Sequence, residues 1–371
     1  MKVAVICIAP GFGGLELYAE KVARYYQSRN VFAFFVGLQG AFLQERIQND
    51  KLSARFVNPI NVSFPILTAW RLAKWLESEN VDIMHIHSRF DLPLASIAKK
   101  LSRRRVAIVY TRQMALTRPK RDPWHRFQYR QVDRLLTITK KLRNEAIAFL
   151  PMSSKNIHVL YYGVPEPEYV NRNLCAKLPG WKKAETNDFR VAIFGRIKPE
   201  KGQYLLIEAL SHLSRRGIKV NAWMVGRPMD AKYIERLHEK VQQYNLQEQV
   251  LFVDFIKDPQ NLMPCFNAII LASHNETFGL VLAEAMRSRV AVIGSNSGGV
   301  TEIIEDGKTG LLFESGNSKA LADCIEKLWR DRDFLDQLAI QGKHFADRNF
   351  SDESHLENLT MHLESVMQEN R

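Results

Sequence analysis

Short apolar runs alternate with stretches of helical periodicity along the first half of the chain. The runs predict strands near 2–9, 31–37, 54–59, 81–88, 106–111, 134–140 and 157–163. Amphipathic patterns over 15–28 and 66–80 predict helices between them. Strands separated by helix-length patterns are typical of βαβ units, so this half predicts a parallel sheet covered by helices.

The second half repeats the same alternation. Apolar runs predict strands near 189–197, 219–226, 249–255, 268–274 and 290–295. The segment between the halves is polar, contains several prolines and lacks periodicity, which favours a linker. We therefore expect an α/β protein of two doubly wound domains, 1–168 and 189–350, joined by a linker at 169–188.

Length and composition agree with a soluble two-domain protein. The chain has 371 residues, of which 46% are hydrophobic and 25% charged. Its cysteines show no CxxC pair and no metal-ligand spacing, and we expect reduced thiols in a cytosolic protein. These are Cys7, Cys175, Cys265 and Cys324. The apolar part of the N-terminus is too short for a signal peptide, and the run at 31–38 is shorter than the roughly 20 residues of a membrane helix.

The net charge of +12 is unevenly distributed. Residues 1–190 carry 31 basic and 15 acidic side chains, whereas residues 191–371 carry 21 and 25. The excess is concentrated in 99–143, with 15 basic and 2 acidic side chains. Such asymmetry indicates an anionic partner of the first half, although a solvated basic surface explains it equally well.

The stretch SHNETFGLVLAEAM at 273–286 is a candidate anion site. It follows a predicted strand and leads into a helix, whose first N–H groups and partial positive charge favour phosphate. Glu276 and Glu284 stand eight positions apart, which is about 12 Å along a helix. Hydrolytic carboxylate pairs lie about 5–10 Å apart, so these acids fit two ends of one ligand better, or are unrelated loop and helix acids.

Two further loops have the composition of phosphate-binding loops. FGRIKPEKG at 194–202 places Arg196 and Lys201 after a strand, where two cations suit a diphosphate. PGFGGLE at 10–16 forms a glycine-rich turn after the first strand but lacks the Walker lysine and serine. Each of these signals is weak when taken alone.

Taken together, FGRIKPEKG, the E-x7-E pattern and SGGVTEIIEDGKTGLLF resemble the retaining glycosyltransferases of family 4 with the GT-B fold. The resemblance covers nearly the whole chain. It implies two Rossmann-like domains with the active site in the cleft between them. It also implies a C-terminal helix, about 351–371, that packs back onto the first domain. A nucleotide sugar would be the donor, with no metal and no cofactor.

The resemblance assigns roles to individual residues. Glu284 would hold the ribose hydroxyls, and Glu276 the hydroxyls of the transferred sugar. Arg196 and Lys201 would neutralise the departing diphosphate. The remaining donor contacts would come from backbone groups of Phe278, Gly279 and Leu280 and from Gly13 and Gly14 of the first domain.

The acceptor site departs from the family pattern. Many relatives have a histidine where YTRQM places Gln113, which cannot carry a proton at neutral pH. His85 and His87 lie on one side of a predicted strand, and His87, nearer its carboxyl end, is the better acceptor-site candidate. A structural or metal-binding H-x-H is the alternative, but two histidines without a carboxylate make an incomplete metal site.

The basic stretch combines its cations with Trp124 and Phe127, which suits docking to anionic lipid headgroups beside a lipid-linked acceptor. The expected patch consists of Arg103, Arg104, Arg105, Lys120 and Arg121. An acidic glycan or a phosphorylated lipid is an alternative partner, whereas no nucleic-acid motif accompanies the charge.

We therefore expect a retaining glycosyltransferase that uses a UDP- or GDP-sugar in lipopolysaccharide or surface polysaccharide synthesis. Its acceptor would be a lipid-linked saccharide, and it would be cytoplasmic, at most peripheral at the inner face of the membrane. A nucleotide-sugar epimerase or hydrolase on the same fold is one alternative. A non-catalytic module that binds anionic glycans or lipids is another.

Overall fold

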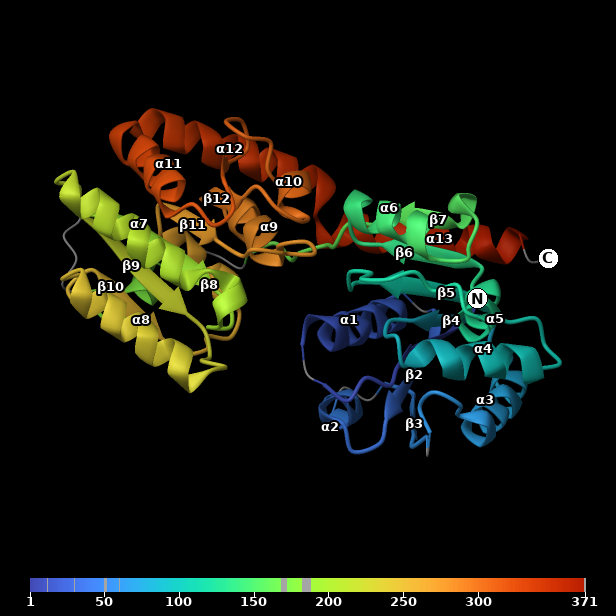
Figure 1. Ribbon diagram of the computed structural model, residues 1–371. Helices are drawn as coiled ribbons and strands as arrows, with labels where there is room; N and C mark the ends of the chain where they lie inside the picture. The colour runs from blue at the N-terminus through green and yellow to red at the C-terminus, as the bar shows by residue number, and fades with distance from the viewer. Residues whose placement is uncertain are drawn as a thin grey trace. The chain divides into compact units, whose positions relative to one another are not determined.

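The computed structural model describes residues 1–11, 13–29, 31–49, 52–59, 61–167, 172–181 and 188–369. The chain divides into two compact units (Figure 1). The first unit comprises Met1–Tyr161 and His355–Arg371, and the second comprises Tyr162–Ser354. Residues 169–171 and 182–187 of the expected linker lie outside the described residues. In the part of the chain that is described, no helix is both long and apolar enough to span a membrane.

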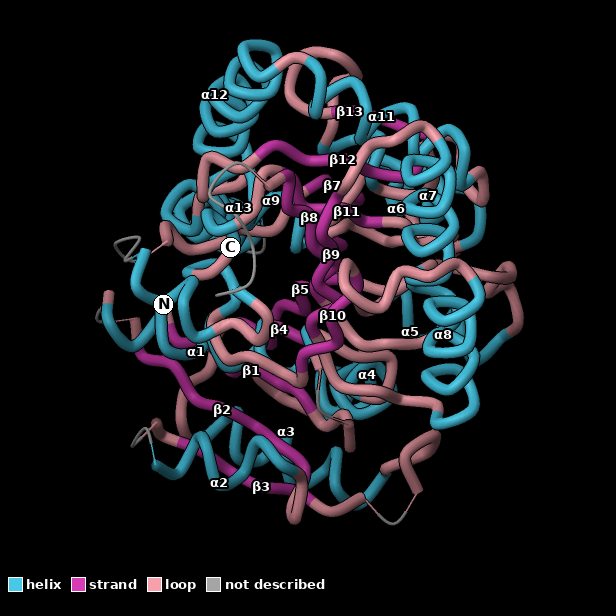
Figure 2. The backbone as a smooth tube through the Cα atoms, turned by 90° about the vertical axis from the view of Figure 1, so that its left-hand side faces the viewer, coloured by secondary structure: helices cyan, strands magenta, loops and turns pink. Residues whose placement is uncertain are grey.

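The first unit is built on a seven-stranded parallel sheet. Its strands lie in the order β3 (Ala54–Val57), β2 (Phe32–Leu38), β1 (Lys2–Cys7), β4 (Ile83–Ile86), β5 (Ala107–Arg112), β6 (Arg134–Thr137) and β7 (Ile157–Val159). The central strands are mostly apolar and almost fully buried, as expected of strands covered on both faces. Figure 2 shows β3 as the outer strand beside β2, and β3 is correspondingly short and partly exposed.

Helices connect these strands, and the two predicted over 15–28 and 66–80 are among them. They are α1 (Gly14–Ser28), α2 (Phe42–Asn49), α3 (Ile66–Ser78), α4 (Asp91–Leu101), α5 (Pro123–Arg130) and α6 (Lys140–Phe149). Local signals set two of their starts. Asp122 caps α5 by accepting a hydrogen bond from the His125 amide, with Pro123 as the first helical residue. Thr139 caps α6 in the same way through the Leu142 amide.

The second unit has a six-stranded parallel sheet. Its order is β10 (Val250–Val253), β9 (Val220–Val225), β8 (Phe189–Phe194), β11 (Ala268–Leu271), β12 (Ala291–Ser295) and β13 (Leu311–Phe313). The helices are α7 (Gln203–Arg215), α8 (Ala231–Gln243), α9 (Leu280–Arg287), α10 (Val300–Ile303), α11 (Ser318–Arg330) and α12 (Arg332–Asn349). Figure 1 shows α7 in contact with both α8 and α11. The expected α/β class with two parallel sheets is confirmed.

The last helix, α13 (Asp352–Glu369), packs along the first unit. Arg134 on β6 donates a hydrogen bond at 2.6 Å to the Glu369 carboxylate. His355 contacts the Tyr18 hydroxyl on α1 at 2.9 Å. The C-terminal helix α13 is therefore part of the first unit, together with residues 1–161.

The expectation that all four cysteines are reduced thiols is wrong for one pair. Cys175 and Cys265 form a disulfide across 90 residues of sequence, whereas Cys7 and Cys324 are free. Sequence spacing gives no indication of such a pairing, because the two residues meet only through the fold. The bond fastens residues 172–181 to the segment before β11 within the second unit, and Trp181 also packs against Trp223 of β9.

Candidate functional site

The carboxyl edge of the second sheet gathers three loops. They follow β8, β11 and β12, which are neighbours in the sheet. Glycines allow the loop backbones to stack directly. A Cβ at Gly202, which has φ +69°, would lie 2.2 Å from the Ala272 carbonyl oxygen, and one at Gly298, with φ +65°, would lie 2.1 Å from that of Glu276. These glycines therefore hold the three loops in one rigid layer.

Two of the predicted catalytic residues meet in this layer. Lys201 Nζ lies 2.5 Å from Glu276 Oε2, and both side chains are partly buried. The Glu276 carbonyl accepts a hydrogen bond from the Gly299 amide at 2.8 Å, which fixes the loop. Arg196, the third predicted catalytic residue, follows β8 with an exposed side chain. Among the described residues it makes no ion pair, so its charge is available to a ligand.

The predicted donor-binding backbone lies at the start of α9. The Phe278 side chain is only 2% exposed and packs edge-on against Tyr162 and Phe350. Gly279 adopts φ +108° and precedes Leu280, the first residue of α9, without a side-chain cap for the helix. Because Phe278 points into the core, this segment can present backbone N–H groups rather than side chains.

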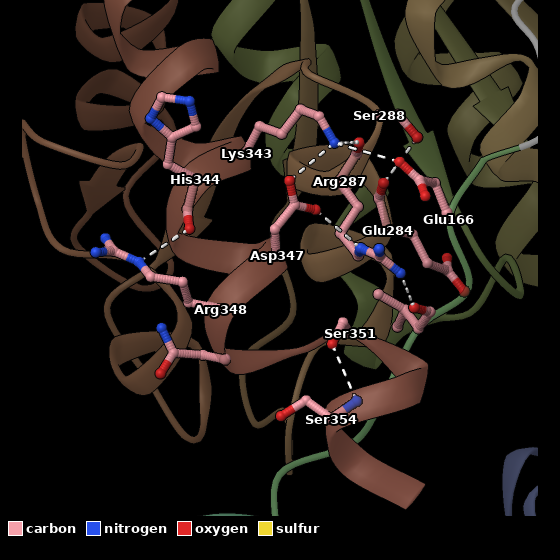
Figure 3. Close-up of polar contacts among 12 residues, drawn as sticks. Glu166, Glu284, Arg287, Ser288, Lys343, His344, Asp347, Arg348, Ser351 and Ser354 are labelled. Atoms are coloured by element: carbon pink, nitrogen blue, oxygen red, sulfur yellow. Dashed lines mark hydrogen bonds and ion pairs between the residues drawn. The ribbon is translucent and has the colours of Figure 1, made fainter. Parts of the chain in front are cut away.

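Glu284 lies on α9, a helix that polar contacts of Arg287 hold against the rest of the second unit (Figure 3). Arg287 Nε lies 3.1 Å from Asp347 Oδ1, and its guanidinium also donates to the Val164 carbonyl. Burial opposes ionisation of Asp347, but hydrogen bonds from Lys343 and Arg287 outweigh it and lower the pKa of that carboxyl. No local sequence pattern signals this network, because its members lie on α9, α12 and the segment before the second sheet.

The carboxyl edge of the first sheet holds the predicted acceptor residues. His87 follows β4 and Gln113 follows β5, and these strands are neighbours in register. Both side chains are buried. The two ring nitrogens of His87 lack a hydrogen-bond partner among the described residues. The same is true of the amide nitrogen of Gln113. Burial, followed by the effect of His85, holds the pKa of His87 well below its usual value, so its imidazole is neutral.

His85 has a structural role behind His87. Its Nε2 lies 2.8 Å from the Thr111 hydroxyl, and burial lowers its pKa to about 3. The rings of His85 and His87 are 4.2 Å apart, and Tyr18 packs edge-on against His87 at 5.4 Å. His355 of α13 holds the Tyr18 hydroxyl, an interaction across 337 positions that the sequence does not reveal.

Asp91 is a further functional candidate that the sequence did not single out. Its buried carboxylate accepts hydrogen bonds from the Ile8, His87 and Ser88 amides at 2.8, 2.9 and 2.6 Å. Burial raises its pKa to about 6, against the opposing effect of these donors. Asp91 thereby joins the ends of β1 and β4 and fixes the backbone of His87.

The glycine-rich turn differs from a simple phosphate cradle. Gly13 is the N-cap of α1 in an extended conformation, and Gly14 is its first residue. The buried carboxylate of Glu16 faces the turn: a Cβ at Gly13 would lie 3.5 Å from Glu16 Oε2, and one at Gly11 would lie 3.6 Å from Oε1. A carboxylate at this position disfavours a second anion and suits hydroxyl or amide donors instead.

The structure divides the expected basic patch between two edges of the first sheet. Arg103, Arg104 and Arg105 precede β5, whereas Lys120 and Arg121 come after it. Arg104 is held by Asp82 Oδ1 at 2.5 Å and by the Val81 carbonyl at 2.9 Å, so its charge stabilises the fold. The five residues therefore do not form one continuous surface.

A second group of cations lies at the carboxyl edge. Burial, followed by Arg118, Arg112 and Arg89, lowers the pKa of Lys120. Arg89 follows β4, and the other three lie at or after the end of β5. Within the described parts of the chain, none of these four cations pairs with a carboxylate. They form a region of excess positive charge near His87 and Gln113, which Asp122 offsets in part by raising the pKa of Lys120.

Comparison with known families matches both units. Residues 180–345 match the family described as glycosyl transferases group 1, and residues 12–166 match glycosyltransferase family 4. The chain is 24% identical over 366 residues to N-acetyl-alpha-D-glucosaminyl L-malate synthase of Bacillus anthracis, covering 95% of this chain and 94% of that protein. It is 22% identical to the lipopolysaccharide core biosynthesis mannosyltransferase LpsB of Rhizobium meliloti, covering 77% and 80%.

Solved structures share the fold. A glycosyltransferase from Rickettsia africae superposes with a TM-score of 0.88 at 21% identity, covering 100% of this chain and 99% of that one. Anabaena Alr3699/HepE in complex with UDP superposes with a TM-score of 0.85 at 21% identity, covering 98% and 100%. The expected pair of Rossmann-like α/β domains is thus confirmed.

Proposed function

The chain belongs to the group 1 glycosyltransferases of family 4, and we propose that it moves a sugar from a nucleotide-diphosphate sugar to a saccharide acceptor with retention of configuration. In this proposal the second unit binds the donor and the first unit binds the acceptor. Relatives that act in lipopolysaccharide core synthesis support a role in lipopolysaccharide or surface polysaccharide assembly.

The contact between Lys201 and Glu276, beside the start of α9, carries the donor assignment. A departing diphosphate needs positive charge and backbone N–H groups, and the transferred sugar needs acceptors for its hydroxyls. Lys201, the exposed Arg196 and the amides at Gly279 and Leu280 supply the first requirement, and Glu276 supplies the second. In this proposal a single nucleotide sugar engages both sets of groups.

Glu284 is the proposed contact to the nucleotide ribose. It lies within α9, after the proposed diphosphate site at the start of that helix. The anchoring of α9 through Arg287 and Asp347 keeps the carboxylate at a fixed position. The complex of HepE with UDP favours a uridine nucleotide, although a guanosine nucleotide meets the same contacts.

The proposed reaction requires no metal and no cofactor. The bond between the anomeric carbon and the diphosphate breaks, and its electron pair stays on the diphosphate oxygen beside Lys201 and Arg196. The acceptor hydroxyl attacks the same face of the sugar, and its proton passes to the departing oxygen. Retention follows because entry and departure use the same face, and the enzyme contributes charge stabilisation and positioning.

The acceptor is proposed to be an anionic, lipid-linked saccharide. His87 and Gln113 offer neutral, buried hydrogen-bonding groups that suit sugar hydroxyls. Arg89, Arg112 and Lys120 lie at the same edge and form no salt bridge in the described structure, and cations so arranged suit a phosphate or carboxylate on the acceptor. A phosphate that links the saccharide to its lipid meets this requirement.

The donor is tested by binding of UDP-, GDP- and ADP-sugars to the wild type and to Glu284→Ala, measured by ligand-observed NMR. We expect one nucleotide class to bind and the variant to weaken it at least tenfold. Glu235→Ala on the exposed face of α8 is the matched control. Unchanged affinity in Glu284→Ala would refute the ribose contact. Nucleotide release without added acceptor would favour a hydrolase over a transferase.

A further inference from the structure

The first unit presents a group of large apolar side chains at its surface, here called the apolar rim. It consists of Phe64, Ile66, Leu67, Trp70, Trp124 and Phe127. Phe64 is 52% exposed, Ile66 63%, Leu67 53% and Trp70 50%, while Trp124 and Phe127 are half-buried. Exposed apolar residues are ordinary when scattered, but a contiguous group marks a surface that meets a partner.

The exposed residues of α3 are not part of its packing against the sheet. That helix buries Ala69, Leu72, Ala73 and Leu76 against the rest of the unit. Ile66, Leu67 and Trp70 are instead exposed to solvent, from the margin of this buried face round to the opposite side of the helix. A surface helix normally exposes polar residues, so three large apolar side chains among the exposed residues of α3 need another explanation.

Aromatic stacking joins two distant segments into this surface. The Phe64 and Trp124 rings stack with centroids 4.6 Å apart, and Trp124 stacks on Phe127 at 5.4 Å. Phe64 lies in the connection after β3, and Trp124 follows the connection after β5. Figure 1 shows α4 between α3 and α5. The rim therefore extends from the carboxyl edge of the sheet, where His87 and Gln113 also lie.

Cations flank the apolar rim. Arg71 adjoins Trp70, Arg126 lies between Trp124 and Phe127 in sequence, and Arg118 precedes α5. All three side chains are exposed, and in the described part of the chain none makes an ion pair. The acid nearest in sequence to Arg118 and Arg126 is Asp122, and its carboxylate lies 2.5 Å from His125 Nδ1. The charge around the rim is thus positive and complementary to an anionic surface.

We propose that the apolar rim docks this protein onto an anionic lipid bilayer. Tryptophan and aliphatic side chains enter the headgroup region, while arginines beside them contact lipid phosphates. This combination favours a bilayer over a protein partner, because unpaired cations surround the apolar centre. Docking at this edge would bring the proposed acceptor site to the membrane that holds a lipid-linked saccharide. The docking itself does not depend on sugar transfer.

The test is cosedimentation of the full chain with vesicles of phosphatidylglycerol and phosphatidylcholine, and with vesicles of phosphatidylcholine alone. We expect binding to the anionic vesicles that weakens at least tenfold in Leu67→Ser/Trp70→Ser. The control Phe32→Ser/Met361→Ser removes apolar groups that are 68% and 61% exposed elsewhere on the same unit, and it should bind like the wild type. Because all four side chains are exposed, an unchanged melting temperature checks that each variant is folded.

A second pair of substitutions tests the contribution of the cations to vesicle binding. Arg71→Gln/Arg126→Gln should weaken binding to anionic vesicles by about fivefold per removed cation. An equal loss of vesicle binding in the rim variant and its control would overturn the proposal. Equal binding of the wild type to vesicles with and without phosphatidylglycerol would overturn it as well. The proposal would also be overturned if the wild type did not bind vesicles but self-associated, and if the rim variant lost that association. The surface would then be assigned to a second copy of the chain. Loss of donor binding would bear on the proposed function and not on docking.

Discussion

The carboxyl edges of the two sheets are built from the same βα connections but hold opposite kinds of polar groups. In the second unit Lys201 and Glu276 pair with each other, and loop carbonyls such as that of Glu276 receive backbone hydrogen bonds. In the first unit His87 and Gln113 are buried with atoms that lack partners among the described residues. The second edge thus contains a charged pair beside the unpaired Arg196 and Ser273 Oγ, whereas the first edge contains two unpartnered neutral side chains beside cations that form no salt bridge in the described residues.

The difference shows how each edge can meet a ligand. A partly exposed ion pair contributes only about 0–1 kcal/mol to stability. Breaking the pair therefore costs little when Lys201 binds a phosphate and Glu276 binds a hydroxyl of the ligand. A buried polar group without a partner costs about 1–3 kcal/mol, which a hydroxyl-bearing ligand would recover. The second unit is thus suited to a charged donor, and the first to a ligand with many hydroxyls.

The largest effect should come from breaking the charge match of the second unit. Lys201→Ala should lower kcat/KM about 10²–10³-fold, because a preorganised charge at the leaving group is lost. Lys198→Ala is the control: this lysine lies in the same loop and only approaches Glu200 at 3.6 Å. Nucleotide release in the presence of acceptor measures the rate. If both variants lose activity equally, the loop matters through its total charge rather than through Lys201.

The next effect concerns stability in acid, where the two units should differ. Burial lowers the pKa of His85 and of His355 to about 3, from about 6.5 in the unfolded chain. The unfolded state therefore binds more protons as pH falls below 6.5, and at pH 5.5 each histidine removes about 1 kcal/mol of stability. The raised pKa of Asp91, about 6, opposes this by about 1 kcal/mol.

The second unit has a different acid window. The lowered pKa of Asp347 contributes stability above its unfolded value of about 3.8, and that contribution is lost only as pH falls through the lower, folded value. Urea unfolding measured from pH 7.5 to 5 should thus show the loss in the first unit. His355→Gln should reduce the pH dependence, whatever its effect on absolute stability. A pH dependence that is the same in this variant would remove His355 from the explanation.

A third prediction separates function from structure at the first edge. Gln113→Leu removes a buried amide whose nitrogen has no partner among the described residues, so the melting temperature should stay the same or rise. If the acceptor uses that amide, acceptor kcat/KM should fall about tenfold or more while donor affinity is unchanged. Full activity together with higher stability would mean that Gln113 is only an unfavourable buried group.

The sequence predicted the features that depend on neighbouring residues and missed those that depend on the fold. Periodicity placed every strand except β13 and several of the helices, and the order of strand, loop and helix placed Lys201, Glu276 and Glu284 at one edge. The contact between His355 and Tyr18, the disulfide of Cys175 and the anchoring of Arg287 join segments far apart in sequence. Such contacts are set by tertiary packing, for which local pattern contains no information.

The basic stretch shows the same limit. Its 15 cations appear as one cluster in the sequence, yet β5 runs through the middle of it. A strand of this length crosses the sheet from one edge to the other, so the residues before it and the residues after it lie at opposite edges. Charge density along a chain therefore does not define a surface.

The smallest effect should come from the amino edge of the first sheet. Arg103 and Arg105 are exposed there, whereas the apolar rim extends from the carboxyl edge. Arg103→Gln/Arg105→Gln should therefore change binding to anionic vesicles by less than about twofold, since charges beyond about 8–10 Å are largely screened at physiological salt. Arg104→Gln should instead lower the melting temperature, because it releases Asp82 and the Val81 carbonyl. A large loss of vesicle binding in the double variant would mean that the amino edge also faces the membrane, and the contrast between the two edges would no longer explain where the protein docks.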